Sequence, residues 1–136
     1  MTVDEFRVVL TCEEKNAAIA FYRDGLGLDP REVWTGNGTG QMFFAGRGIL
    51  EIFDTSYARS VDEIEVGKKI SGQIRFAFQV NDVYAAVERA INYGASLIHE
   101  PVLTPWGDLN ARIESPEGMQ ITFFEVQAID EELSTE

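Results

Sequence analysis

Alternation of apolar and polar residues predicts two long strands at equivalent places in the chain. The first spans residues 5–11, where every second residue from Phe6 is apolar. The second spans residues 73–80, where every second residue from Ile74 is apolar. Side chains alternate between the two faces of a strand, so each strand has one apolar face. We expect these apolar faces to lie under helices, which leaves the opposite faces to line a concave surface.

A helical spacing of apolar residues follows each of these strands. The first predicted helix covers residues 14–26 and stops at Gly27, and the second begins at Asp82 and stops at Gly94. The remaining predicted strands are residues 29–35, 41–45, 48–54, 95–99, 108–114 and 119–126. The element order is therefore βαβββ, twice, and Gly94 lies 67 residues after Gly27. The repeated order at a nearly constant offset indicates an internal duplication.

The duplication predicts an α+β fold in which residues 1–136 form one domain of two βαβββ modules. The modules cover about residues 3–55 and 73–126. Residues 56–72 are of mixed charge, and we interpret them as a connecting loop. Residues 127–136 form an acidic tail.

Composition limits the partners and the location. The formal net charge of −12 argues against a nucleic-acid partner, which needs basic surface. No apolar run approaches the length of about 20 residues that spans a bilayer, so we expect no membrane partner. The single cysteine, Cys12, and an N-terminus without a signal-peptide pattern favour a cytoplasmic protein.

One carboxylate stands out within the predicted strand of residues 48–54. Alternation places Glu51 on the same face as Ile49 and Phe53, and an unpaired buried charge is costly. Either this face is simply solvated, or Glu51 lies in a pocket and pairs with a cation. That cation would be a metal or an arginine. Arg7 and Arg75 occupy the non-apolar faces of the two long strands and so point to the same concave surface.

Two motifs give the chain a family resemblance. The first module contains Phe21-Tyr22-Arg23-Asp24-Gly25-Leu26-Gly27, and the second contains Pro105-Trp106-Gly107 followed by Pro116-Glu117-Gly118. With the paired modules, the chain resembles the vicinal oxygen chelate superfamily, which includes glyoxalase I, extradiol dioxygenases and bleomycin-resistance proteins. The motifs are specific for the fold and weak for the activity.

The resemblance also implies positions for metal ligands. Metal-using members place four ligands on strands, usually His, Glu or Gln, and the matching positions here are Arg7, Glu51, Arg75 and Thr122. Only Glu51 is of a usual ligand type, and a guanidinium offers donors only. We therefore expect no metal and no other cofactor.

Two interpretations of the arginines remain open. Arg7 and Arg75 either neutralise Glu51 and brace the modules, or they bind an anionic or carbonyl-bearing ligand. Aromatic side chains near the predicted surface complete the candidate ligand site: Phe53, Phe124, Trp34, Phe44 and Trp106. The only histidine, His99, is either a general acid or base or a surface residue.

The expected function is metal-free binding of a small organic molecule. Three of the four metal-ligand positions hold residues of unusual type, and aromatic side chains lie near the predicted surface. In both respects the chain is most similar to the bleomycin-resistance branch, whose members sequester a drug as homodimers. The alternative is an enzyme of the same superfamily, a lyase, isomerase or dioxygenase that depends on a metal or uses Glu51 as base. The catalytic residues of such an enzyme are unknown, and Glu51 is the first candidate.

Overall fold

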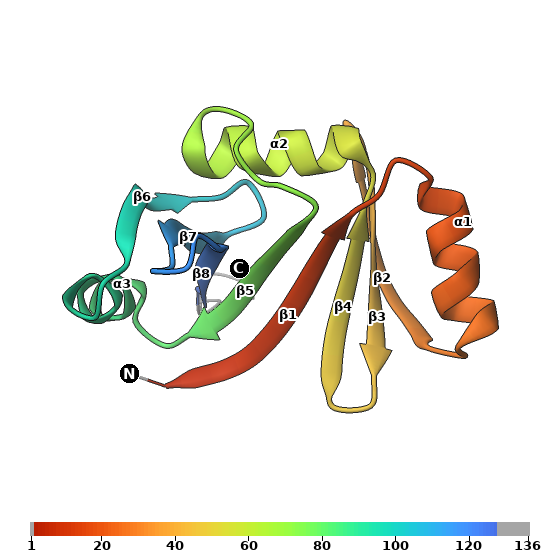
Figure 1. Ribbon diagram of the computed structural model, residues 1–136, viewed down its shortest axis with the longest axis horizontal. Coiled ribbons are helices and arrows are strands. Elements are labelled where there is room, and N and C mark those ends of the chain that lie inside the picture. Colours follow the sequence, from red (N-terminus) through yellow and green to blue (C-terminus); the bar gives the residue numbers. More distant parts are fainter. Residues whose placement is uncertain (1, 128–136) are drawn as a thin grey trace, which may run out of the picture.

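A computed structural model describes residues 2–127, so most of the predicted acidic tail lies outside the described residues. All eight strands belong to one mixed sheet in the order β2-β3-β4-β1-β5-β8-β7-β6 (Figure 1). The strands are β1 (Val3–Thr11), β2 (Asp29–Gly36), β3 (Gly38–Ala45), β4 (Gly48–Phe53), β5 (Ile74–Val80), β6 (Ser96–Leu103), β7 (Asp108–Glu114) and β8 (Gln120–Val126). The helices are α1 (Lys15–Ala20), its π-helical continuation η1 (Phe21–Gly25), α2 (Thr55–Val66) and α3 (Val83–Asn92).

The strand pairing confirms the predicted α+β fold and the duplication. In each module the first strand pairs in parallel with the last, β1 with β4 and β5 with β8. The second, third and fourth strands of each module form an antiparallel meander. The modules meet where β1 and β5 pair antiparallel at the centre of the sheet. The first and last strands of the two modules are thus neighbours in the order β4-β1-β5-β8, and they carry Arg7, Glu51, Arg75 and Thr122.

The helices cover the ends of the convex face and leave its middle open. Helix α3 buries Val83, Ala86 and Val87 in a core with residues of β5, β7 and β8. Helix α1 and η1 bury no residue. Figure 1 shows α1 and α3 at opposite ends of the sheet, with β1 and β5 between them. The prediction that the apolar faces of both long strands lie under helices therefore holds at the end of β5, where Val80 packs against α3, and is wrong at the middle of the sheet, where Phe6 is 41% exposed and Ile74 46%.

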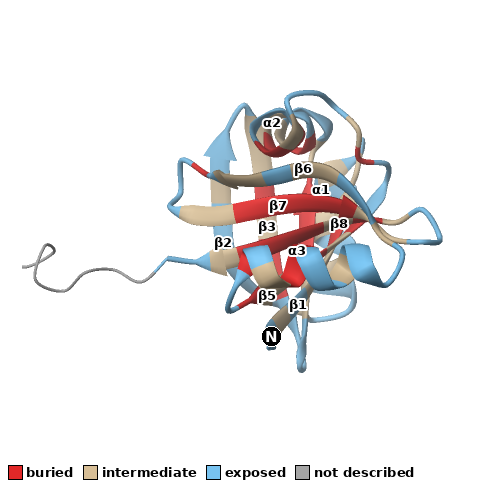
Figure 2. Cartoon of the chain, turned by 90° about the vertical axis from the view of Figure 1, so that its left-hand side faces the viewer, coloured by how far each residue is buried: buried red, intermediate tan, exposed pale blue. Residues whose placement is uncertain are grey.

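The connection between the modules also differs from the prediction. The sequence predicts a loop over residues 56–72, but most of this segment is helix α2. The Asp54 carboxylate accepts a hydrogen bond from the backbone N–H of Tyr57 at 2.8 Å, which caps the helix, and Gly67 ends it with a φ of 87°. Helix α2 crosses one edge of the concave face, and its buried residues face the sheet (Figure 2). It therefore adds a wall to the concave surface.

No helix among residues 2–127 combines the length and the apolar character that crossing a membrane requires.

Candidate functional site

The concave face of the sheet holds a cavity of about 660 Å³. Its floor comes from β1, β4, β5, β7 and β8, and its walls come from β2, α2 and the turn between β6 and β7. A volume of this size suits a drug-sized ligand. The predicted ligand residues that line it are Arg7, Glu51, Phe53, Arg75, Thr122, Phe124, Trp34 and Trp106.

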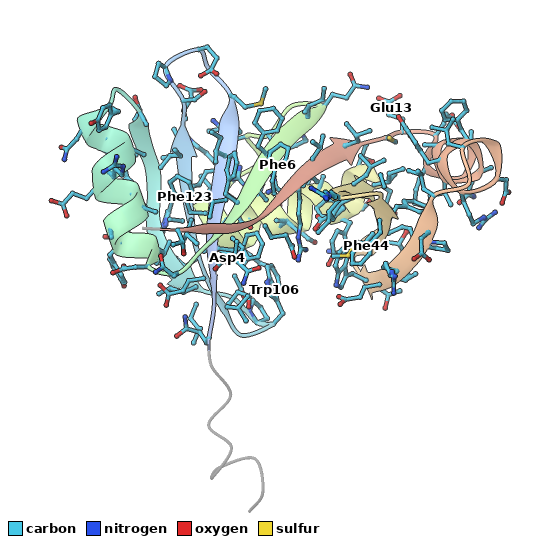
Figure 3. All side chains as sticks on the ribbon, turned by 90° about the horizontal axis from the view of Figure 1, so that it is seen from below. Asp4, Phe6, Glu13, Phe44, Trp106 and Phe123 are labelled. Carbon is cyan, nitrogen blue, oxygen red and sulfur yellow. The ribbon has the colours of Figure 1, made fainter. Side chains whose placement is uncertain are left out.

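Phe44 is the one predicted ligand residue that does not line the cavity. It pairs with Ile49 near the β3–β4 turn, two residues along the strand from Met42, which pairs with Glu51. The Arg31 guanidinium lies 4.3 Å from its ring centroid, so the ring packs at the surface. Trp106, also labelled in Figure 3, lines the cavity, whereas Phe44 does not.

Strand register brings the charged residues together. Val9 of β1 pairs with Glu51 on one side and with Arg75 on the other. Paired residues of neighbouring strands share a face. The alternation pattern therefore placed both charged side chains on the cavity face correctly.

Arg7 and Glu51 form an ion pair on the cavity floor. Arg7 Nη1 donates to Glu51 Oε1 at 2.6 Å, and its Nε donates to the Glu5 carboxylate. Glu51 is 5% exposed. Burial raises the pKa of Glu51, and the positive charges of Arg7 and Arg75 oppose this rise without cancelling it. Burial would lower the pKa of Arg7, but Glu51 and Glu5 raise it.

Arg75 lies in the same cavity but does not pair with Glu51. Its Nη1 donates to Thr122 Oγ1 at 2.8 Å, and no carboxylate of the described residues lies within 4.0 Å of its guanidinium. Arg75 is 6% exposed. Burial lowers the pKa of Arg75, because desolvation disfavours the charged form. The predicted contact of both arginines with Glu51 therefore holds for Arg7 alone.

A buried cluster that the sequence analysis missed lies behind the cavity. We call it the Arg112 cluster, and it consists of Arg112, Asp62, Glu65, Ser71, Gln120 and Thr122. Arg112 Nη2 donates to Asp62 Oδ1 at 3.1 Å and to Glu65 Oε1 at 2.8 Å. The Thr122 hydroxyl donates to Glu65 Oε1 at 2.8 Å and accepts from Arg75, which joins the cluster to the cavity.

The signals for this cluster were present but faint. Polar residues alternate with apolar ones along β7, and Asp108, Asn110 and Arg112 share its cavity face. In α2, Asp62 and Glu65 fall at helical spacing with the buried Ala58 and Val61. Acidic side chains on the buried face hid the amphipathic pattern of that helix.

Asn110 has the one buried side-chain atom without a hydrogen-bond partner among the described residues. Its Nδ2 donates to Glu65 Oε2 at 3.1 Å, which fixes the orientation of the amide. Its Oδ1 has no partner, although Asn110 lines the cavity. A buried acceptor without a partner is unusual in a folded protein and requires an explanation.

Aromatic rings of β2, β4 and α2 form one wall of the cavity. The Trp34 and Phe53 rings meet edge to face with centroids 6.3 Å apart, and Phe53 meets Tyr57 in the same way at 4.8 Å. Gly40 lies beneath the first pair, where a Cβ atom would stand 2.9 Å from Phe53 and 3.1 Å from Trp34. The absence of a side chain at Gly40 thus lets the rings pack against the sheet.

The four positions at which the family holds a metal do not suit one here. Arg7 and Arg75 cannot ligate a cation, and Glu51 already accepts a hydrogen bond from Arg7. Within residues 2–127, no group of three or more His, Cys, Asp or Glu side chains is arranged to hold a metal ion. A hard cation needs several oxygen or imidazole ligands, so the donor set of this cavity does not fit it.

His99 and Cys12 lie outside the cavity. His99 Nδ1 lies 2.7 Å from the backbone oxygen of Glu100, so its ring is engaged locally. Burial raises the pKa of the Cys12 thiol, which disfavours the reactive thiolate.

The fold and the cavity define a protein of two βαβββ modules with a ligand-sized site on a concave sheet. Residues 6–123 match the family model for the Glyoxalase/Bleomycin resistance protein/Dioxygenase superfamily, and the chain belongs to this superfamily. No curated protein sequence matches the chain significantly.

Solved structures with the same fold share little sequence with the chain. The hypothetical protein BH1468 from Bacillus halodurans C-125 is 15% identical with a TM-score of 0.70, covering 95% of this chain and 98% of its own. A superfamily member from Vibrio splendidus 12B01 is 14% identical with a TM-score of 0.62, covering 91% and 99%. Streptomyces coelicolor methylmalonyl-CoA epimerase is 16% identical with a TM-score of 0.65, covering 93% and 100%. At these identities the similarity concerns the fold and not the activity.

Proposed function

We propose that the protein binds a small organic molecule in the concave cavity without a resident metal ion, as drug-sequestering members of the superfamily do. The observation that carries the proposal is the composition of the cavity. Guanidiniums occupy two positions where metal ligands would stand, and aromatic rings form the walls of a ligand-sized space. Such a surface binds through stacking and charge-assisted hydrogen bonds, and it needs no metal to do so.

The two tryptophans of the chain give a direct test. Trp34 and Trp106 both line the cavity, so intrinsic tryptophan fluorescence reports on its occupancy. We expect compounds from an aromatic library, bleomycin included, to quench this fluorescence and to raise the melting temperature together. A library that produces neither effect would contradict the proposal.

Elemental analysis tests the metal-free part of the proposal. We expect the purified protein to contain no stoichiometric zinc, nickel, iron or manganese. One equivalent of tightly held metal that is lost in Glu51→Ala would refute it.

A second candidate is an enzyme that uses Glu51 as a general base. Burial raises the pKa of this carboxylate in a ligand-sized cavity, which suits proton abstraction. Against it, Glu51 Oε1 is engaged by Arg7. Deuterium exchange into bound compounds, followed by NMR, separates the two candidates. Exchange that Glu51→Gln abolishes would favour an enzyme, and we expect none.

We also propose that the protein forms a homodimer. Helix α1 and η1 bury no residue, and Phe21 and Leu26 there are each 56% exposed. Uncovered apolar surface of this kind commonly marks an interface, and homodimers are the commonest oligomers. Light scattering at micromolar concentration should give twice the mass of the chain, and a monomer mass would contradict this.

A further inference from the structure

Arg75 differs from the other buried cations of the site in what its guanidinium contacts. Only Nη1 donates to an atom of the described residues, namely Thr122 Oγ1. Nε and Nη2 donate to none, and neither belongs to the fully enclosed unpartnered atoms. Because Arg75 lines the cavity, these two nitrogens are open to it. Arg75 therefore presents unused donors to the space that a ligand would fill.

The Arg75 guanidinium also forms no ion pair with a carboxylate of the described residues. Arg112 is held by Asp62 and Glu65, and Arg7 by Glu5 and Glu51. A buried charge without a partner is costly, and burial accordingly lowers the pKa of Arg75. A planar oxyanion is the group that a guanidinium edge binds with two parallel hydrogen bonds. A ligand carboxylate at Arg75 would supply both the missing charge and the missing acceptors.

Aromatic surface begins directly beside this guanidinium. The Arg75 Cζ atom lies 5.9 Å from the centroid of the Phe53 ring, and Phe53 contacts Trp34 and Tyr57. A small ligand whose carboxylate binds Arg75 can therefore also contact the Phe53 ring. We infer that the cavity is a site for an aromatic carboxylate, whose carboxyl group pairs with Arg75 and whose ring packs on the Phe53 wall. This inference rests on the proposed small-molecule function and names its ligand class.

The net charge of −12 does not oppose this ligand class at the site. Charge spread over the surface acts at long range and is screened by salt, whereas contact with the buried Arg75 is screened little. Added salt should thus raise the association rate of a carboxylate while changing the dissociation rate less.

The experiment compares matched pairs of compounds by quenching of tryptophan fluorescence at pH 7. The pairs are benzoate with benzamide, and each hydroxybenzoate and aminobenzoate with its amide. We expect the carboxylate of a pair to bind about 10- to 100-fold more tightly, as charge-assisted hydrogen bonds imply. This comparison uses the unmodified protein and does not depend on the folding of any variant.

Variants then assign the carboxylate to Arg75. Arg75→Gln should remove the preference for acids over amides, and Arg75→Lys, which keeps the charge but not the planar fork, should restore part of it. Arg89→Gln is the matched control, because Arg89 is exposed on α3 and lies outside the cavity. It should bind as the unmodified protein does.

The outcomes separate the inference from the proposed function. Amides that bind as well as their acids, or an acid preference that survives Arg75→Gln, would overturn the inference and leave small-molecule binding intact. Failure of every compound in this panel and in the aromatic library would overturn both.

Discussion

Two groups of buried charge lie within one site and differ in how completely they are satisfied. In the Arg112 cluster, all three guanidinium nitrogens of Arg112 donate to side chains of the cluster. Glu65 accepts hydrogen bonds at both carboxylate oxygens. At the cavity floor, Arg7 and Glu51 pair with each other, while Arg75 keeps two nitrogens unused.

Under the proposed function, the difference separates the charges that stabilise the fold from those that would bind a ligand. A fully hydrogen-bonded network has nothing left to offer a ligand, and its value lies in fixing the position of α2 against β7 and β8. Groups with spare donors are costly to the folded state and are retained where they bind something. The boundary between the two groups is Thr122, whose hydroxyl contacts both Arg75 and Glu65.

Breaking the Arg112 cluster should have the largest effect on stability. Arg112→Met would leave Asp62 and Glu65 buried without their cation, so we expect a loss of about 3–5 kcal/mol in the free energy of unfolding. Urea denaturation measures this loss. Arg89→Met, at an exposed position of α3, is the control and should change stability by less than about 0.5 kcal/mol. A loss as small as that of the control would show that the cluster does not hold the fold.

Breaking the pair on the cavity floor should cost less, because its arginine side chain is 20% exposed. We expect Arg7→Met to lower the free energy of unfolding by about 1–3 kcal/mol, since it leaves Glu51 ionised and unpaired. Adding Glu51→Gln should recover part of this loss by removing the charge.

A double-mutant cycle at pH 7 measures the coupling between Arg7 and Glu51. Additive effects within about 0.3–0.5 kcal/mol would mean that the two side chains do not interact in solution. The assignment of Arg7 and Glu51 to one ligand site on the cavity floor would then be weakened.

The smallest expected effect is a pH dependence from Glu51. Burial raises the pKa of this carboxyl in the folded protein above its unfolded value of about 4.3. The folded state therefore holds the proton to higher pH, and the stability that Glu51 contributes at low pH is lost as pH rises through the folded pKa. Compared with Glu51→Gln, the unmodified protein should lose stability from about pH 4 until the pH passes the folded pKa of Glu51, above which the difference should stay constant. Stability curves of the two proteins that stay parallel would exclude the raised pKa.

The sequence was sufficient for the fold because two signals repeat. Strand alternation and glycine helix stops recur at a near-constant offset, and the sheet order of the two modules is the same. The same signals failed at α2, where Asp62 and Glu65 occupy the buried face and mask its helical period. They also failed to show that α1 and α3 cover only the ends of the convex face, because periodicity says which face is apolar but not what covers it.

The candidate site was predictable as far as the strand faces reach. Alternation placed Glu51 and Arg75 on the cavity face, but it could not say that Arg75 bonds Thr122 instead. That choice depends on Glu65, which comes from α2. Phe44 is an aromatic residue at a strand end, and the sequence does not show which strand ends border the cavity; Phe44 pairs with Ile49 beside the β3–β4 turn, and Met42 is the residue of β3 opposite Glu51.

Helix α2 has a consequence for the symmetry of the molecule. Two copies of one motif, paired through β1 and β5, would by themselves build a binding surface with nearly twofold walls. The helix belongs to the junction of the copies, and among residues 2–127 no second helix stands in the equivalent place after β8. It adds Tyr57, Val61 and Glu65 to one side of the cavity, so the two sides of the surface carry different side chains. Under the proposed function, a ligand whose two ends differ then has one favoured orientation. The connection between the modules, which contains α2, thus makes the two sides of a duplicated binding surface different.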